Sequence, residues 1–198
     1  MDLVARVKGI LLTPKTEWAV IDAEPTTVAT LYTGYIIPLA LIPAVAGFIG
    51  MTVLGWNFLG TTIRFSMTAG LERAVLQFAT GLAMPFLLAM IVDALAPNFG
   101  GEKSQIQALK VSAFSSTAFW VAGVCTILPA LTILGLLGLY SLYLLYLGLP
   151  VLMKASQDKA MAYTVVVIVC ALVVGIVLSI IVNQIVPLPI TGLGRLTP

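Results

Sequence analysis

The sequence predicts an all-α fold, a polytopic membrane bundle of five transmembrane helices preceded by an N-terminal amphipathic interfacial helix. Of its 198 residues, 60% are hydrophobic and only 9% are charged, whereas a soluble domain carries about 25% charged residues. The mean hydropathy is +1.10. A chain of this length cannot hide so much apolar surface from water, so lipid must be its solvent. The expected segments are an amphipathic cytoplasmic or interfacial segment (1–26), a five-span membrane domain (27–187) and a short exported tail (188–198).

The first twelve residues predict an amphipathic helix that lies in the headgroup region. Apolar residues recur at three- and four-residue spacing, while Arg6 and Lys8 fall elsewhere on the helical wheel. Pro14 is expected to end this helix, and Trp18 is expected to anchor the segment at the membrane interface. The alternative is a solvated N-terminal tail. The apolar positions are Leu3, Val4, Val7, Ile10 and Leu11.

Two apolar runs predict the first two spans, since about 20 helical residues cross about 30 Å of hydrocarbon. Residues 28–54 carry no charge and contain Pro38 and Pro43, so we expect a kink or a local break there. Residues 74–96 contain one acid, Asp93.

The stretches on either side of the second span predict loops. Residues 56–73 mix aromatic and polar side chains around Arg64, which predicts a surface loop with interfacial aromatics. Residues 97–110 predict a polar loop in which Gly100 and Gly101 make the turn.

A long uncharged run predicts a hairpin of two further spans. No Asp, Glu, Lys or Arg occurs in 111–153, and one straight helix of that length would span roughly 65 Å, twice the membrane. We expect the chain to turn at about 129–134. A short polar connection at 154–159 then leads to the fifth span, 161–186.

The distribution of basic residues predicts the orientation, because cytoplasmic loops carry more Lys and Arg. With five spans, the N-terminus shares one side with the loops 97–110 and 154–159. That side has seven basic residues and the other has three, which predicts a cytoplasmic N-terminus and a periplasmic C-terminus in the inner membrane. The seven are Arg6, Lys8, Lys15, Lys103, Lys110, Lys154 and Lys159, and the three are Arg64, Arg73 and Arg195.

Several function classes are disfavoured by composition. Histidine is absent, which removes the commonest general base and metal ligand. Cys125 and Cys170 lie in apolar runs and read as packing residues, and a net charge of +2 is too small for nucleic-acid binding. The acids Glu17, Asp22 and Glu24 are expected to be solvated. We therefore expect neither catalysis, nor a cofactor, nor a metal.

Asp93 is the one ionisable residue inside a predicted span, and an intramembrane acid is by default a functional candidate. The structural alternative is stronger, because Asp93 is only about one helical turn from the predicted cytoplasmic end of its span. Its carboxylate would then reach headgroup water or the hydroxyls of Ser115, Ser116 or Thr117.

Three tyrosines, Tyr140, Tyr143 and Tyr146, lie three residues apart and span a 120° arc of one helix. Their hydroxyls need partners in lipid, so they should face other helices or an interface. A structural ladder is the main interpretation, and the lining of a polar pocket is the alternative.

Several elements of the sequence resemble the bacterial branch of the Yip family, the Ypt/Rab-interacting multi-pass membrane proteins. The resemblance covers nearly the whole chain: the pattern Pro14, Trp18, Ile21 and Glu24, the Gly100-Gly101 turn, and the stretch 109–169, which contains LYLLYLGLPVLM. It implies five spans and a cytoplasmic N-terminus. Eukaryotic relatives bind prenylated Rab GTPases and act in vesicle trafficking and membrane shaping. No acidic Tyr-Gly-Pro motif precedes the first span here, so the Rab-binding role does not carry over.

Two functional hypotheses remain. The leading one is a non-enzymatic membrane protein that organises the lipid bilayer or a partner, as a scaffold or as an accessory subunit of another membrane protein complex. The rival is a small transporter or channel that uses Asp93, with Pro38, Pro43 and Pro85 interrupting helices and freeing carbonyls for a solute.

Overall fold

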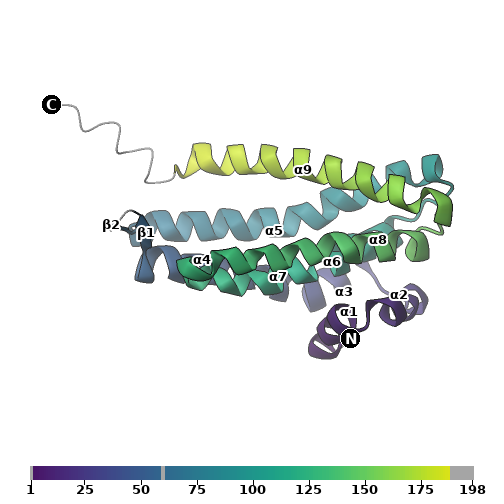
Figure 1. Ribbon diagram of the computed structural model, residues 1–198, viewed down its shortest axis with the longest axis horizontal. Coiled ribbons are helices and arrows are strands. Elements are labelled where there is room, and N and C mark those ends of the chain that lie inside the picture. The colour runs from purple at the N-terminus through teal and green to yellow at the C-terminus, as the bar shows by residue number, and fades with distance from the viewer. Residues whose placement is uncertain (1, 59–60, 188–198) are drawn as a thin grey trace.

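The computed structural model describes residues 2–58 and 61–187 and, within them, all side chains except those of 56–63 and 129–133. In this part of the chain, five helical segments are long and apolar enough to cross a bilayer. They form an elongated bundle, with two short N-terminal helices on one flank and the last helix on the other (Figure 1). The predicted five-span helical fold is confirmed, whereas the tail 188–198 lies outside the described residues. The segments are Val28–Leu54, Met67–Phe99, Gln105–Ile127, Leu134–Leu152 and Gln157–Ile185.

The N-terminal segment forms two helices, α1 (Leu3–Leu12) and α2 (Pro14–Ala23). The Asp2 carboxylate begins α1 by accepting hydrogen bonds from the amides of residues 4 and 5, at 3.0 and 3.2 Å. Pro14 ends α1, as predicted, but also takes the first position of α2, where its missing N–H costs no hydrogen bond. α2 was not predicted from the sequence.

The first span contains the irregularity that its prolines predict. It is a widened π-helical turn before Pro38, in which the amide of Ile37 donates to the carbonyl of Tyr32, five residues back. A proline has no amide to donate, so the ordinary ladder is interrupted there. The parts are α3 (Val28–Leu31), a π-helix (Tyr32–Ile36), α4 (Ile37–Ile49) and a second π-helix (Gly50–Leu54).

The segment between the first two spans is more ordered than the predicted surface loop. It contains an antiparallel pair of strands, β1 (Trp56–Phe58) and β2 (Thr61–Ile63), in which Asn57 is opposite Thr62. The interfacial role predicted for the aromatic rings of residues 56 and 58 falls outside the described side chains.

The second span is longer than predicted. α5 (Met67–Leu95) begins seven residues before position 74, because the Ser66 hydroxyl caps it by accepting from the amide of Ala69 at 3.2 Å. Glu72 and Arg73 interrupted the apolar run but not the helix.

The predicted turn at Gly100 and Gly101 is confirmed. After a 3-10 turn (Ala96–Phe99), Gly100 adopts φ +73°, and the amide of Gly101 donates to the carbonyl of Ala96 at 2.9 Å. The loop is shorter than 97–110, since the Ser104 hydroxyl caps a helix that begins at Gln105.

The hairpin predicted from the uncharged run is also confirmed. The third span ends at Ile127 and the described apolar part of the fourth begins at Leu134, so the chain reverses between them, with the helical path interrupted at Leu128, one residue before the expected 129–134. The elements are α6 (Gln105–Ser115), α7 (Thr117–Ala122), 3-10 segments (Gly123–Ile127, Pro129–Leu139 and Gln157–Lys159), α8 (Tyr140–Leu152) and α9 (Ala160–Ile185).

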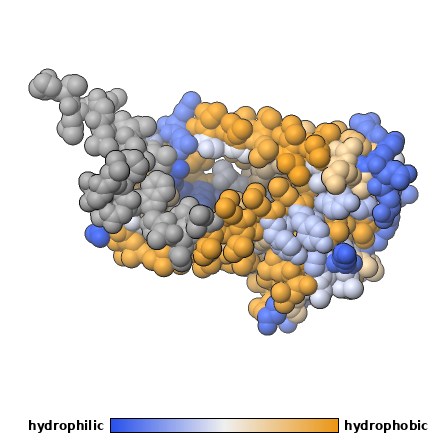
Figure 2. All heavy atoms as spheres, in the orientation of Figure 1, coloured by the Kyte–Doolittle hydropathy of each residue, from blue (hydrophilic) through white to orange (hydrophobic). Residues whose placement is uncertain are grey.

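The spans differ greatly in how much protein surrounds them. The third is central, with 72% of its most apolar window buried inside the protein, whereas only 6% of the corresponding window of the fifth is buried. α9 therefore presents its side chains to lipid, and Figure 2 shows a hydrophobic band along it between hydrophilic ends. Its exposed apolar residues include Leu172, Val173, Ile176 and Ile180.

Candidate functional site

The N-terminal helices are held to the bundle by a charged residue that lies off the predicted apolar face of the first helix. Arg6 of α1 is 9% exposed and pairs with the carboxylates of Glu17 in α2 and Glu24 just after it. Its guanidinium carbon lies 5.8 Å from the ring centroid of Phe114 in α6. The prediction that the acids are solvated is wrong for Glu17, which is 18% exposed, because Glu17 and Glu24 compensate a cation that is buried against an aromatic ring.

Trp18 lies deeper than an interfacial anchor would. It is completely buried, and its ring meets that of Phe114 edge-on, with centroids 6.5 Å apart. Gly148 of α8 makes room for it, since a Cβ there would be 2.7 Å from the Trp18 ring. The anchor interpretation is therefore wrong, and Trp18 packs α2 against the bundle.

The end of α2 has its own set of partners. The Lys110 ammonium of α6 donates to the carbonyls of Ile21 and Glu24, at 2.9 and 2.7 Å. Asp22 accepts from the side-chain amide of Gln107 at 2.9 Å and pairs with Lys154. A cation is favourable at the C-terminal end of a helix, where carbonyls lack intrahelical donors.

The outward side of the two helices is apolar and cationic. Val4, Leu12 and Val20 are 60%, 77% and 53% exposed, and Lys8 and Lys15 are exposed as well. The helix pair lies on the flank of the bundle (Figure 1). Its outward surface combines apolar and cationic side chains, which is the composition of an interfacial helix.

The tyrosines do not form a uniform ladder. Tyr140 donates its hydroxyl to the carbonyl of Leu11 at 3.1 Å, so it holds the end of α1. Tyr143 is 41% exposed, with its ring 5.5 Å from that of Tyr140. Tyr146 lines a small cavity beside Lys15 and Trp18. Tyr140 and Tyr146 thus face the N-terminal helices.

Asp93 does not reach the hydroxyls predicted for it. The hydroxyls of Ser115 and Ser116 donate to carbonyls within their own helix, and that of Thr117 lies 2.6 Å from the hydroxyl of Tyr35. Asp93 instead lines a cavity of about 290 Å³ with Gln105 and apolar residues. Its Oδ1 is buried and has no hydrogen-bond partner among the described residues.

Gly100 and Gly101 join two loops at the same end of the bundle. A Cβ on Gly101 would be 2.7 Å from the carbonyl oxygen of Met153, at the end of α8. The next amide, that of Glu102, donates to the same oxygen at 2.8 Å. The turn therefore fixes α8 against the start of α6.

Three residues that matter here were missed as site residues by the sequence reasoning: Arg6, Lys110 and Gly148. A signal existed for Arg6, since four helical steps of 100° place it only 40° from Ile10 on the buried face. Lys110 is buried, and Trp18 packs on Gly148, through contacts between segments far apart in the chain. A single sequence contains no signal for such contacts. Among the described residues, no three Cys, Asp or Glu side chains could hold a metal ion.

The fold and the docked helices define a class, that of multi-pass membrane proteins with a pair of short N-terminal helices packed against the bundle. The Yip1 domain matches residues 8–180, and the chain therefore belongs to the Yip1 domain family.

Curated relatives agree with this assignment. The chain is 28% identical over 166 residues to the "Inner membrane protein YohC" of Escherichia coli strain K12, which covers 81% of this chain and 85% of the relative. The protein of the same name from E. coli O6:H1 strain CFT073 matches with the same values. No solved structure matches this chain.

Proposed function

We propose that this protein is a non-enzymatic organiser of the inner membrane whose docked N-terminal helices act as a fixed wedge in the cytoplasmic leaflet. The observation that carries this function is the contrast between the two sides of α1. Arg6 is buried and paired on the inner side, whereas Val4 and Leu12 are largely exposed on the outer side. A segment held in this way presents apolar side chains to the interface permanently.

The physical effect of such a wedge falls on the surrounding lipid. A free amphipathic helix can leave the membrane when insertion is unfavourable, because its binding is reversible. Buried ion pairs and Trp18 prevent α1 and α2 from leaving the bundle, so the lipid must adapt. Area is added to one leaflet only, which favours a membrane that is convex on the side of that leaflet. The names of the relatives support the inner membrane as the location.

Reconstitution into large vesicles of phosphatidylethanolamine and phosphatidylglycerol tests this function. As the protein-to-lipid ratio rises, we expect smaller or tubular vesicles by electron cryomicroscopy. Leu12→Asp should abolish the effect, because a charge at a position 77% exposed keeps the helix out of hydrocarbon, and Leu12→Met at the same position should retain it. Vesicles unchanged by the wild-type protein, or changed equally by Leu12→Asp, would contradict the proposal.

The accessory-subunit version of the same function involves a protein partner. It draws support from α9, which presents exposed apolar side chains along its length. Affinity purification in mild detergent should then retain a defined partner at fixed stoichiometry. Purification only as an isolated monomer, with no lipid preference, would count against both versions.

The transporter hypothesis has one supporting observation, the unpartnered Oδ1 of Asp93. The other residues that it needs do not converge on that carboxylate. Pro43 and Pro85 line a different cavity from the one beside Asp93, and Pro38 lines neither. Flux measured in proteoliposomes should therefore be the same for Asp93→Asn and wild type. A solute flux that the variant abolishes would restore the transporter hypothesis.

A further inference from the structure

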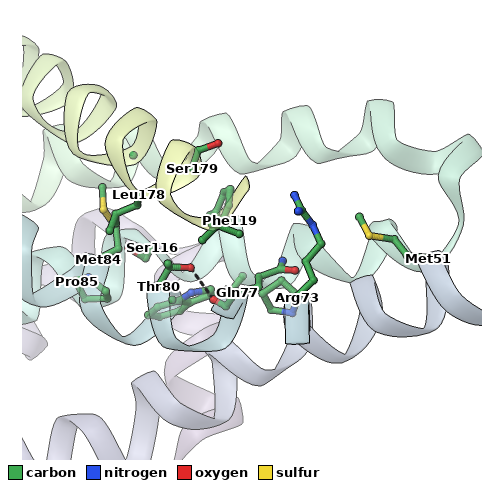
Figure 3. A pocket seen from close by; sticks show the side chains of 15 residues that line it. Met51, Arg73, Gln77, Thr80, Met84, Pro85, Ser116, Phe119, Leu178 and Ser179 are labelled. Atoms are coloured by element: carbon green, nitrogen blue, oxygen red, sulfur yellow. Dashed lines mark hydrogen bonds between the residues drawn. The ribbon is translucent and has the colours of Figure 1, made fainter. Parts of the chain in front are cut away.

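A third cavity lies inside the membrane-spanning part, between the second and fifth spans. It has a volume of about 540 Å³, within the roughly 300–1,000 Å³ of ordinary ligand sites. α5 and α9 form most of its wall, and the first and third spans close it. The surface is visibly hollowed beneath α9 (Figure 2). Its lining residues include Arg73, Gln77, Thr80, Met84, Ser116, Phe119, Leu178 and Ser179, labelled in Figure 3.

The wall formed by α5 changes from charged to apolar along its length. Arg73, Gln77, Thr80 and Met84 follow one another at helical spacing on one face (Figure 3). At 1.5 Å per residue, the eleven steps from Arg73 to Met84 cover about 16 Å. That is close to half of the hydrocarbon core of about 30 Å, the depth of one leaflet. The α5 wall of the cavity thus has the polarity gradient of a lipid, and its length is about that of the acyl region of one leaflet.

Arg73 is a cation without a carboxylate partner at the polar end of this cavity. Two of its N–H groups donate to the carbonyl of Val186 and to Oδ1 of Asn183, both at 3.1 Å. None of the ion pairs within the described residues includes it, although Glu72 precedes it in the chain. A guanidinium has five N–H donors, so three remain. Figure 3 shows the side chain reaching away from α5 between the helices.

We infer that this cavity binds one anionic phospholipid of the leaflet that contains Arg73. The lipid phosphate accepts hydrogen bonds from the free N–H groups of Arg73, since a guanidinium matches phosphate geometry. One acyl chain extends past Thr80 toward Met84 and Pro85. The polar side chains of Gln77 and Ser179 lie between these ends, at the level of the ester groups. Charge complementarity and length select this occupant, and the inference is independent of the proposed wedge.

Native mass spectrometry of the delipidated full-length protein in mild detergent tests the site with two defined probes. Dioleoyl phosphatidylglycerol should bind tightly at one molecule per chain, and dioleoyl phosphatidylcholine should bind more weakly. Arg73→Gln should weaken phosphatidylglycerol binding about tenfold or more, because hydrogen bonds to charged groups are the strong ones, and should remove the preference between the two lipids. Arg64→Gln is the matched control, since Arg64 is exposed near the same end of the bundle.

A second variant tests the acyl-chain part without altering any charge. Gly175 lines the cavity, and a Cβ added there meets nothing within 4 Å, so Gly175→Leu should fold normally and fill the space. It should weaken both lipids. Gly34→Leu is the control, because a Cβ at Gly34 also meets nothing within 4 Å and Gly34 is outside the cavity lining.

Several results would overturn the inference. Equal binding of the two lipids to wild type would show that charge does not select the lipid. Unchanged binding in Gly175→Leu would show that the lipid does not occupy the cavity. Preferential retention of palmitate over phosphatidylglycerol would show that the occupant is a fatty acid. If Arg73 serves only to hold the end of α9, then Arg73→Gln will lower the thermal midpoint and leave the lipid preference of the folded protein intact. If Arg73→Gln fails to fold, the wild-type preference and Gly175→Leu still decide.

Discussion

Arg6 holds two helices in place, and its removal should release both of them. In Arg6→Met, Glu17 and Glu24 lose their cation, while Glu17 is only 18% exposed. Breaking a buried pair costs about 3–5 kcal/mol, and the half-exposed Glu24 reduces this to about 1–3 kcal/mol. We expect hydrogen exchange of the α1 and α2 amides to become at least about tenfold faster while the spans stay protected.

Two further variants separate the ion pairs from a general effect of charge. Lys8→Met removes an exposed cation from the same helix and should leave exchange unchanged. Combining Arg6→Met with Glu17→Gln and Glu24→Gln removes the uncompensated charges and should recover most of the protection. Equal exchange in Arg6→Met and wild type would mean that Trp18 and the Lys110 and Tyr140 hydrogen bonds dock the helices without the Arg6 ion pairs.

Gly148 gives a second prediction at this scale. In Gly148→Ala, the new methyl group would lie 2.7 Å from the Trp18 ring, so the ring must move outward. Overpacking of this kind costs about 1–3 kcal/mol, and acrylamide should quench tryptophan fluorescence more strongly than in wild type. Gly135→Ala, where a Cβ meets nothing within 4 Å, should behave as wild type. Unchanged quenching in Gly148→Ala would show that α8 yields instead of the ring.

These residues mark what a single sequence could and could not predict about the site. Residue type and spacing singled out Trp18, Tyr140 and the two-glycine turn, and in the structure all three join elements of the bundle. Their partners were not predictable, because Trp18 meets Phe114 and Gly148 only after the chain has folded. Arg6 was placed off the apolar face of its helix, and its burial was not predictable because a charged side chain is buried only when paired and its two glutamate partners lie in the next segment of the chain.

At the scale of elements, the two glycines of the turn between the second and third spans are needed for different reasons. In Gly101→Ala, a Cβ would lie 2.7 Å from a backbone oxygen of Met153, and backbone moves less readily than a side chain. The strain should cost about 1–3 kcal/mol and lower the thermal midpoint by several degrees. Gly100→Asn should cost less than about 1 kcal/mol, since asparagine tolerates the left-handed region.

A calorimetric or fluorescence-based melt of both variants in one detergent decides the matter. If Gly100→Asn proves the more damaging change, then the φ of +73° at Gly100 limits this turn more than the contact with Met153 does.

The helical elements were predictable because unpaired backbone groups are costly in lipid. An apolar run long enough to cross the bilayer must therefore be helical. The hairpin in 111–153 follows from that argument. The start of α5 was missed because Glu72 and Arg73 lower the hydropathy of its first turns without preventing a helix. Lys110 similarly obscured the start of the third span, although it is 4% exposed and fully inside the helix.

For the whole molecule, the structure divides the basic residues more unevenly than the sequence count does. Lys110 lies in the third span and is bonded to α2, and Arg73 lies in the second span and is bonded to α9. Neither is a loop cation. In the sequence count, six basic residues then remain on the side predicted for the N-terminus, against Arg64 and Arg195 on the side predicted for the C-terminus. The positive-inside rule counts loop cations near the spans, so the ratio that favours a cytoplasmic N-terminus rises from 7:3 to 6:2 while the difference stays at four.

The orientation can be tested with reporter fusions along the intact chain. Alkaline phosphatase, active only after export, should be active when fused after residue 187 or in the turn at 128–133. A fluorescent protein that matures only in the cytoplasm should fluoresce when inserted between Gly101 and Ser104.

Arg64 can be replaced by Gln as a matched change at the opposite end, and the topology should not respond. Substituting Lys103, Lys154 and Lys159 together by Gln should yield a mixed topology, because only Arg6, Lys8 and Lys15 then oppose inversion. A cytoplasmic C-terminus in the unaltered chain would mean that one of the five helices does not cross, and the peripheral α9, with 6% of its window buried in the protein, would be the first to re-examine.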